Sequence, residues 1–105
     1  MNGGVGTSAI DGTQEIISRS FQLKQNYPNP FNSQTTIEYN LLSSSNIYLA
    51  IYDLTGKKVA DLINERQEIG LHQITWEAGE LASGIYVCYL RSGKKEQIRK
   101  ILLVK

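Results

Sequence analysis

The chain has one imidazole, His72, and one thiol, Cys88. Nucleophilic catalysis needs a nucleophile, a base and an orienting group that converge on one cleft. His72 alternates in phase with Ile74 and Trp76, which favours a partly buried or edge histidine over a catalytic one. Cys88 lies mid-strand among apolar residues, where a thiol behaves as a small hydrophobe. We therefore expect a module that is not an enzyme.

The remaining polar residues also lack the pattern of a catalytic, metal or cofactor site. One histidine and one cysteine cannot form a zinc site without carboxylates, and the ten carboxylates are scattered through turns and strand ends. Glu65 lies near Glu68 and Glu77 near Glu80, but a glycosidase needs two carboxylates across a cleft, for which a small domain has little room. The glycines of residues 3–6 follow no strand, so they do not form a phosphate loop. A formal net charge of +1 argues against nucleic-acid binding.

Three tyrosines offer a possible binding surface. Tyr48 and Tyr52 share one face of a predicted strand, and Tyr89 lies on a strand that could neighbour it. Flat, exposed aromatic rings are a common way for a β-sandwich to hold a sugar. The same tyrosines are equally suited to covering the sheet. An accessory carbohydrate-binding module of a polysaccharide-degrading enzyme is therefore an open alternative.

The C-terminal fifteen residues are strongly basic. They contain the single acid Glu96 and six cations: Arg91, Lys94, Lys95, Arg99, Lys100 and Lys105. Such a terminus fits a solvated edge strand that lysines protect from aggregation. It equally fits a strand that a partner recognises by strand addition and by charge. An unprotected terminal strand would also favour an edge-to-edge dimer of the isolated domain.

These residues must be positioned by strands. From residue 21 onward, short apolar runs alternate with turn residues at the spacing of a β-sandwich, and segment 59–65 alone is ambiguous between strand and helix. The expected strands lie near residues 21–24, 35–41, 47–52, 58–63, 70–76, 85–90 and 97–104. We therefore predict an all-β, immunoglobulin-like sandwich of about seven antiparallel strands over residues 21–105. Residues 1–20 are rich in glycine and small polar residues, which predicts a flexible linker.

Local details sharpen this prediction. Residues 26–32 contain two prolines and three asparagines and must form an ordered turn. Residues 47–52 are apolar or aromatic on both faces, which is typical of a central strand. Tyr86 follows a turn at the start of a late strand, as in a tyrosine corner, and we expect it to point inward near Trp76. The first residues lack the basic and apolar regions of a signal peptide, so an export signal would lie upstream.

Five blocks of the sequence, in order, resemble the C-terminal sorting domain of the type IX secretion system. They are Asn-Tyr-Pro-Asn-Pro-Phe-Asn at 26–32, the strand and turn at 51–59, Gly-Leu-His-Gln-Ile-Thr-Trp at 70–76, Leu-Ala-Ser-Gly-Ile-Tyr at 81–86, and the terminal block 99–105. Each block alone is weak, but five in register over residues 21–105 form a strong signal. The related immunoglobulin-like domain of flagellar hook-capping proteins is similar as well, although the terminal basic block fits the sorting family better.

The resemblance implies an immunoglobulin-like module at the C-terminus of a larger secreted bacterial protein. Such a module takes an N-terminal cargo through the periplasm and an outer-membrane translocon to the cell surface or the medium. A surface peptidase then often removes it, by cleavage that we expect before Phe21, and the cargo is anchored to the surface. By this analogy, the residues recognised in sorting are Gly84, Tyr86, Lys100, Ile101, Leu102, Leu103, Val104 and Lys105. No cofactor is implied.

Overall fold

The computed structural model describes residues 21–105, so the linker predicted for residues 1–20 lies outside the described residues. Seven strands follow one another: β2 (Phe21–Leu23), β3 (Gln34–Leu41), β4 (Ser45–Asp53), β5 (Lys58–Gln67), β6 (Gly70–Glu77), β7 (Gly84–Ser92) and β8 (Lys95–Leu103). All neighbouring strands pair antiparallel. The predicted all-β, immunoglobulin-like sandwich of seven antiparallel strands is confirmed. Among residues 21–105 there is no helix long and apolar enough to cross a membrane.

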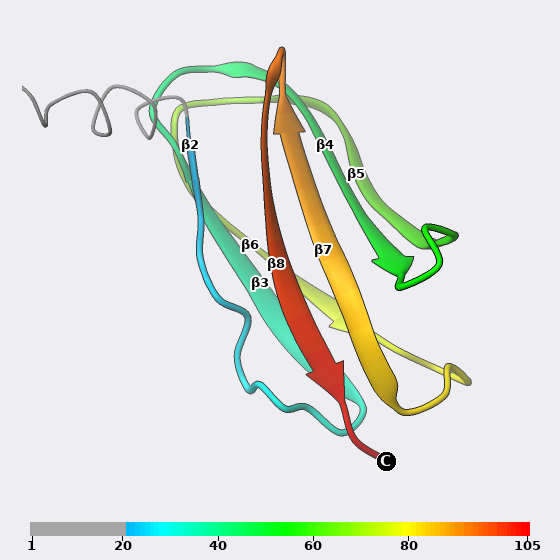
Figure 1. The fold of residues 1–105 in the computed structure, drawn as a ribbon. Coiled ribbons are helices and arrows are strands. Elements are labelled where there is room, and N and C mark those ends of the chain that lie inside the picture. Colours follow the sequence, from blue (N-terminus) through cyan, green and yellow to red (C-terminus); the bar gives the residue numbers. More distant parts are fainter. Residues whose placement is uncertain (1–20) are drawn as a thin grey trace, which may run out of the picture.

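The strands form two layers (Figure 1). One sheet has three strands in the order β2-β3-β6, and the other has four in the order β5-β4-β7-β8. The chain therefore crosses between sheets after β3, after β5 and after β6, as in Greek-key sandwiches. Because β4 lies between β5 and β7, the prediction that residues 47–52 form a central strand is confirmed.

The alternation of apolar and polar residues along each strand determines which side chains form the core, because one face of each sheet is buried. In β3, Ile37, Tyr39 and Leu41 are buried while the intervening residues are partly exposed. In β5, the segment 59–65 that fitted either strand or helix is a strand. It pairs with β4 along its whole length, with two irregularities in register, and this pairing decides its conformation.

Trp76 lies centrally in the core, between aromatic rings from two other parts of the chain. Its ring centroid is 5.7 Å from that of Phe31 and 6.3 Å from that of Tyr86, and both pairs are tilted or edge-to-face. The Tyr86 hydroxyl donates a hydrogen bond of 2.6 Å to the carbonyl oxygen of Ala82, four residues upstream. The predicted tyrosine corner is therefore present, and it satisfies a hydroxyl that burial would otherwise make costly.

The two ends of the described chain lie at opposite ends of the sandwich (Figure 1). Phe21 pairs with Leu41, near the turn that joins β7 to β8. Leu103 pairs with Gly84 at the other end of the same hairpin. A domain that precedes residue 21 would therefore attach at the end of the sandwich away from the C-terminus.

Candidate functional site

The basic C-terminal strand alternates between the core and solvent. Ile101 and Leu103 are 1% and 0% exposed, so their side chains belong to the core. Lys100, Leu102 and Val104 are exposed on the other side of the strand. Of the tail residues expected to serve in sorting, only those with exposed side chains are accessible to a partner while the domain is folded.

The loop of residues 26–32 holds the tail in place. The backbone N–H of Phe31 donates to the Leu102 carbonyl (2.9 Å), and the Val104 N–H donates to the Phe31 carbonyl (2.8 Å). The Leu102 N–H donates to Asn29 Oδ1 (3.0 Å), and Asn32 Nδ2 donates to the Val104 carbonyl (3.2 Å). The backbone groups that point outward from Leu102 to Val104 are therefore already bonded. A receptor strand could pair with this part of the tail only by displacing these bonds, so strand addition stays a prediction.

Closer to the start of β8, side-chain hydrogen bonds connect the two sheets. Gln97 accepts a hydrogen bond from the Leu23 N–H (2.7 Å) and donates to the Phe21 carbonyl (3.2 Å). Arg99 Nε donates to the Leu23 carbonyl (3.0 Å). β2 therefore covers the side of β8 that a sandwich edge would otherwise leave open, one way in which proteins protect edge strands. The edge-strand dimer stays a prediction, with less free edge than the sequence suggested.

The last residue is fixed by the loop that precedes β7. The Lys105 N–H donates to Ser83 Oγ (2.9 Å), and Lys105 Nζ donates to the Gly79 carbonyl (2.6 Å). Gly84 lies opposite Leu103, and Tyr86 is only 7% exposed. The C-terminal block thus contacts residues from two of the other four sequence blocks, those at 26–32 and 81–86. Sequence reasoning missed Asn29, Asn32, Gly79 and Ser83 as partners of the tail, because nothing local to them indicates contact with a segment more than twenty residues away.

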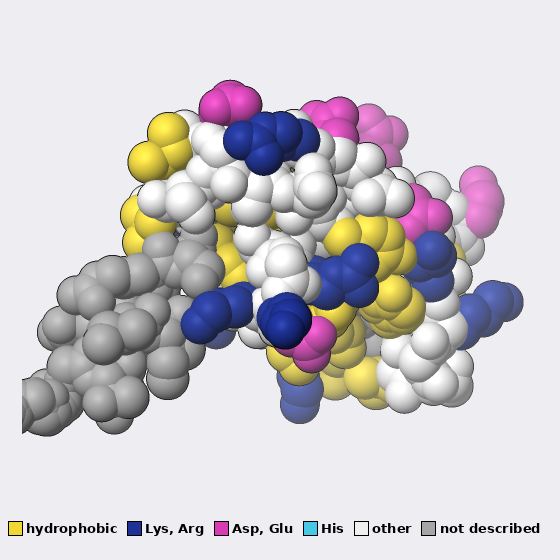
Figure 2. Space-filling view, turned by 90° about the horizontal axis from the view of Figure 1, so that it is seen from above, with side chains coloured by type: hydrophobic (Ala, Val, Ile, Leu, Met, Phe, Trp, Pro, Cys, Tyr) yellow, Lys and Arg dark blue, Asp and Glu magenta, His cyan; other side chains and the backbone are white. Residues whose placement is uncertain are grey.

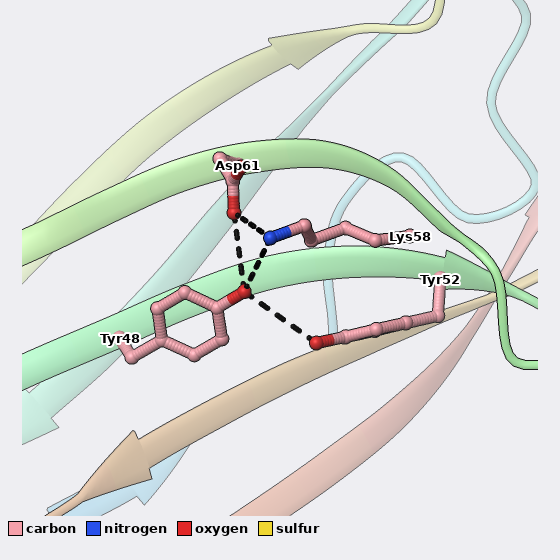
Figure 3. A network of polar contacts seen from close by, with 4 residues as sticks. All are labelled: Tyr48, Tyr52, Lys58 and Asp61. Atoms are coloured by element: carbon pink, nitrogen blue, oxygen red, sulfur yellow. Dashed lines mark hydrogen bonds and ion pairs between the residues drawn. The ribbon is translucent and has the colours of Figure 1, made fainter.

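The three tyrosines lie together on the outer face of the four-stranded sheet. Tyr48 is the centre of a polar network with Tyr52, Lys58 and Asp61 (Figure 3). Its hydroxyl donates to Asp61 (3.1 Å), accepts from Lys58 Nζ (3.1 Å) and lies 3.5 Å from the Tyr52 hydroxyl. Lys58 and Asp61 also form an ion pair of 2.9 Å. The hydrogen bond to Asp61 raises the pKa of Lys58, and the bond to Lys58 lowers the pKa of Asp61.

These rings do not form a flat platform. The Tyr89 ring stands edge-on to both of the others, at interplanar angles of 68° to Tyr48 and 88° to Tyr52. The Tyr89 hydroxyl donates to Glu96 (2.7 Å), a bond that raises the pKa of Tyr89. A coplanar exposed set of rings would favour sugar binding, and these three rings are not coplanar. Sugar binding by Tyr48, Tyr52 and Tyr89 therefore stays a prediction, with less support from the geometry.

The two side chains considered for catalysis, His72 and Cys88, lie in positions where they pack within the fold. His72 lies half-buried on the edge strand β6, stacked on Tyr39 at 5.4 Å, with Nε2 within 2.8 Å of the Glu68 carbonyl. Cys88 is buried, and burial raises the pKa of its thiol to about 12. Its thiolate is therefore disfavoured at neutral pH. Within residues 21–105, no three side chains of His, Cys, Asp or Glu form a group that could hold a metal ion.

The buried thiol predicts a loss of stability at high pH. In the unfolded chain the pKa of Cys88 is near its ordinary value of 9.0, whereas in the folded chain it is about 12. Between these values the unfolded state releases a proton that the folded state retains, so the free energy of unfolding falls as pH rises. Burial also raises the pKa of Tyr39 to about 12, which acts in the same direction. Denaturant titrations across this pH range should show a shallower decline for Cys88→Ala than for the wild type. An equal decline would contradict the assignment to Cys88.

Comparison with known proteins identifies the family of this chain. The model of the family described as secretion system C-terminal sorting domain matches residues 25–105. No curated protein matches the sequence. Among solved structures, PorZ is similar in fold, with a TM-score of 0.56 and 19% identity over 95% of this chain. PorZ is an essential bacterial surface component of the type IX secretion system of Porphyromonas gingivalis. The chain spans 13% of the PorZ chain. Because the family match covers most of its length, this chain belongs to the family of secretion system C-terminal sorting domains.

Proposed function

We propose that this domain is the sorting and surface-anchoring module of a larger secreted protein and that it is recognised in its folded state by the type IX secretion machinery. The observation that carries this proposal is the placement of the tail. Its last residues are fastened to the loop of residues 26–32 and to Ser83, at the end of the sandwich away from Phe21. A cargo attached before residue 21 would leave this end free for a translocon.

The fastened tail makes recognition depend on folding. Leu103 is fully buried, so the exposed residues Leu102, Val104 and Lys105 hold fixed positions only while the sandwich is intact. A partner can then bind them without ordering a flexible segment, which lowers the entropic cost of binding. Within this proposal, a surface peptidase of the system cleaves before Phe21, after passage through the periplasm, and the cargo remains at the surface or in the medium.

The carbohydrate-binding alternative has less support. It depends on three tyrosines, of which Tyr89 stands edge-on to the other two, and the hydroxyls of Tyr48 and Tyr89 are bonded within the sheet. No other described group of residues suggests a sugar site to us. Sorting is therefore the single function that we propose, and the domain itself is expected to do no chemistry.

A secretion assay tests the proposal. Residues 1–105 are fused to a fluorescent cargo that carries an export signal, in a host with a working type IX system. We expect the fusion to reach the surface or the medium and the cargo alone to stay in the periplasm. Retention of the intact fusion in the periplasm would overturn the proposal.

The choice of tail variant matters in this assay. Deleting residues 102–105 removes the buried Leu103 and so impairs folding together with recognition. The double variant Val104→Glu, Lys105→Glu alters only exposed side chains. We expect it to reduce secretion while the isolated chain keeps a cooperative thermal unfolding transition. Normal secretion of this variant would exclude the last two side chains from recognition.

A further inference from the structure

The two outer faces of the sandwich differ in character. On the three-stranded sheet, the outward residues of β3 and β6 are mostly polar, among them Glu38, whose carboxylate bonds Lys24 and Gln73. On the four-stranded sheet, the outward residues of β7 and β8 are mostly apolar. Ile85, Ile98 and Leu102 are 43%, 55% and 36% exposed, and Val87 lies half-buried between them. We call Ile85, Val87, Ile98, Lys100 and Leu102 the β7–β8 face.

The register of the hairpin makes this face continuous. Ile85 lies opposite Leu102, Val87 opposite Lys100, and Tyr89 opposite Ile98. Figure 2 views the sandwich from above the end that holds the β7–β8 turn, and from there hydrophobic side chains are seen among lysine and arginine side chains. Soluble domains rarely leave a contiguous apolar area of a sheet uncovered, and where they do it usually marks an interaction site.

A lysine lies in the middle of this apolar area. Lys100 is flanked along β8 by Ile98 and Leu102 and faces Val87 across the hairpin. On the same sheet face, Lys58 bonds Asp61 at the far edge and Glu96 accepts from Tyr89. The Arg91 guanidinium lies over the Tyr48 ring, 5.1 Å from its centroid. Within residues 21–105, Lys100 forms no ion pair. A partner that covered this face would desolvate the ammonium group, which is favourable only if the partner supplies an opposite charge.

We propose that the β7–β8 face docks a protein of the secretion machinery, through an apolar surface that carries a carboxylate opposite Lys100. This inference rests on the proposed function and names the chemistry of the partner. The face is continuous with the tail through Leu102, so one partner contacts both. A protein is favoured over an anionic membrane because this sheet face carries both signs of charge, Asp61 and Glu96 beside Lys58 and Lys100. Charges placed on a protein surface can match such a pattern, whereas a uniform layer of anionic lipid cannot.

A matched pair of substitutions tests the apolar part. Ile98 and Leu71 are 55% and 57% exposed, and they lie on outer faces of opposite sheets, each on an edge strand. In the fluorescent secretion assay, we expect Ile98→Glu to reduce secretion about tenfold, as loss of a central contact does, and Leu71→Glu to have little effect. Equal secretion of the two variants would overturn the docking face even if the wild-type fusion is secreted. If the wild-type fusion is retained, the sorting function and this inference both fail.

A second pair tests the charge. Lys100→Glu and Lys94→Glu change the net charge equally, and both positions are exposed on the β7–β8 hairpin, Lys94 in its turn. We expect about a tenfold loss of secretion for Lys100→Glu alone, with partial retention by Lys100→Arg. Because these residues are exposed, thermal unfolding should be nearly unchanged, so a loss of secretion reports recognition. An equal effect of both glutamate variants would show a general charge effect and overturn the specific role of Lys100.

A vesicle assay separates the protein partner from a membrane. The full chain is mixed with vesicles of equal parts phosphatidylcholine and phosphatidylglycerol and sedimented. We expect the chain to remain in the supernatant. Sedimentation of the wild type that Ile98→Glu abolishes would assign the face to lipid and overturn the protein partner.

Discussion

Replacing Leu103 by alanine is expected to lower the free energy of unfolding by about 2–5 kcal/mol. The Leu103 side chain is fully buried in the core of the sandwich, two residues before Lys105. Removing its methyl groups leaves a cavity, because the backbone on both sides is bonded to Phe31 and to Gly84 and cannot close in. Denaturant unfolding monitored by the fluorescence of Trp76 measures this loss.

Leu102 is the matched control for this prediction. It is the same residue type one position earlier, but its side chain is 36% exposed. We expect Leu102→Ala to cost less than about 1 kcal/mol of stability. In the secretion assay we expect the opposite order, with the larger loss of secretion for Leu102→Ala, because Leu102 belongs to the β7–β8 face and Leu103 to the core. Similar stability losses in both variants would show that the tail is not built into the fold as described.

Replacing Phe31 by alanine is expected to cost about 3–5 kcal/mol. The ring is 2% exposed and packs on Trp76 at a centroid distance of 5.7 Å. The same residue bonds the tail on both sides of Leu103 through its backbone. Loss of the ring should therefore loosen the tail as well as the core. Amide hydrogen exchange at Val104, whose N–H donates to Phe31, should quicken in the variant relative to amides in the centre of β4.

Tyr27 provides the control within the same loop. Its side chain is 54% exposed, although its backbone pairs with Thr36. Tyr27→Ala should leave the exchange rate at Val104 unchanged and cost little stability. If Phe31→Ala destabilised the domain without faster exchange at Val104, the loop would support the core but not the tail.

The strands and most of the core could be predicted from local pattern. Period-2 alternation places Ile37, Tyr39 and Leu41 on one buried face, and an apolar run on both faces marks β4 as central. Tyr86 was predictable for the same kind of reason, since a buried hydroxyl after a tight turn needs a nearby backbone acceptor. The conformation of segment 59–65 could not be predicted, because its short apolar pattern fits both the helical and the strand period. Pairing with β4 decides that it is a strand.

The candidate site was predictable in composition but not in arrangement. The sequence by itself determined a basic C-terminal strand, a proline- and asparagine-rich turn at residues 26–32, and two tyrosines, Tyr48 and Tyr52, on one strand face. Only the tertiary structure decided that this turn bonds the tail, that Ile101 and Leu103 are buried, and that Tyr89 stands edge-on to Tyr48 and Tyr52. Alternation along a strand depends on neighbours two residues apart, which a sequence displays directly. The bond between Phe31 and Leu102 joins residues far apart in the chain, and it forms only when the two sheets close over a common core.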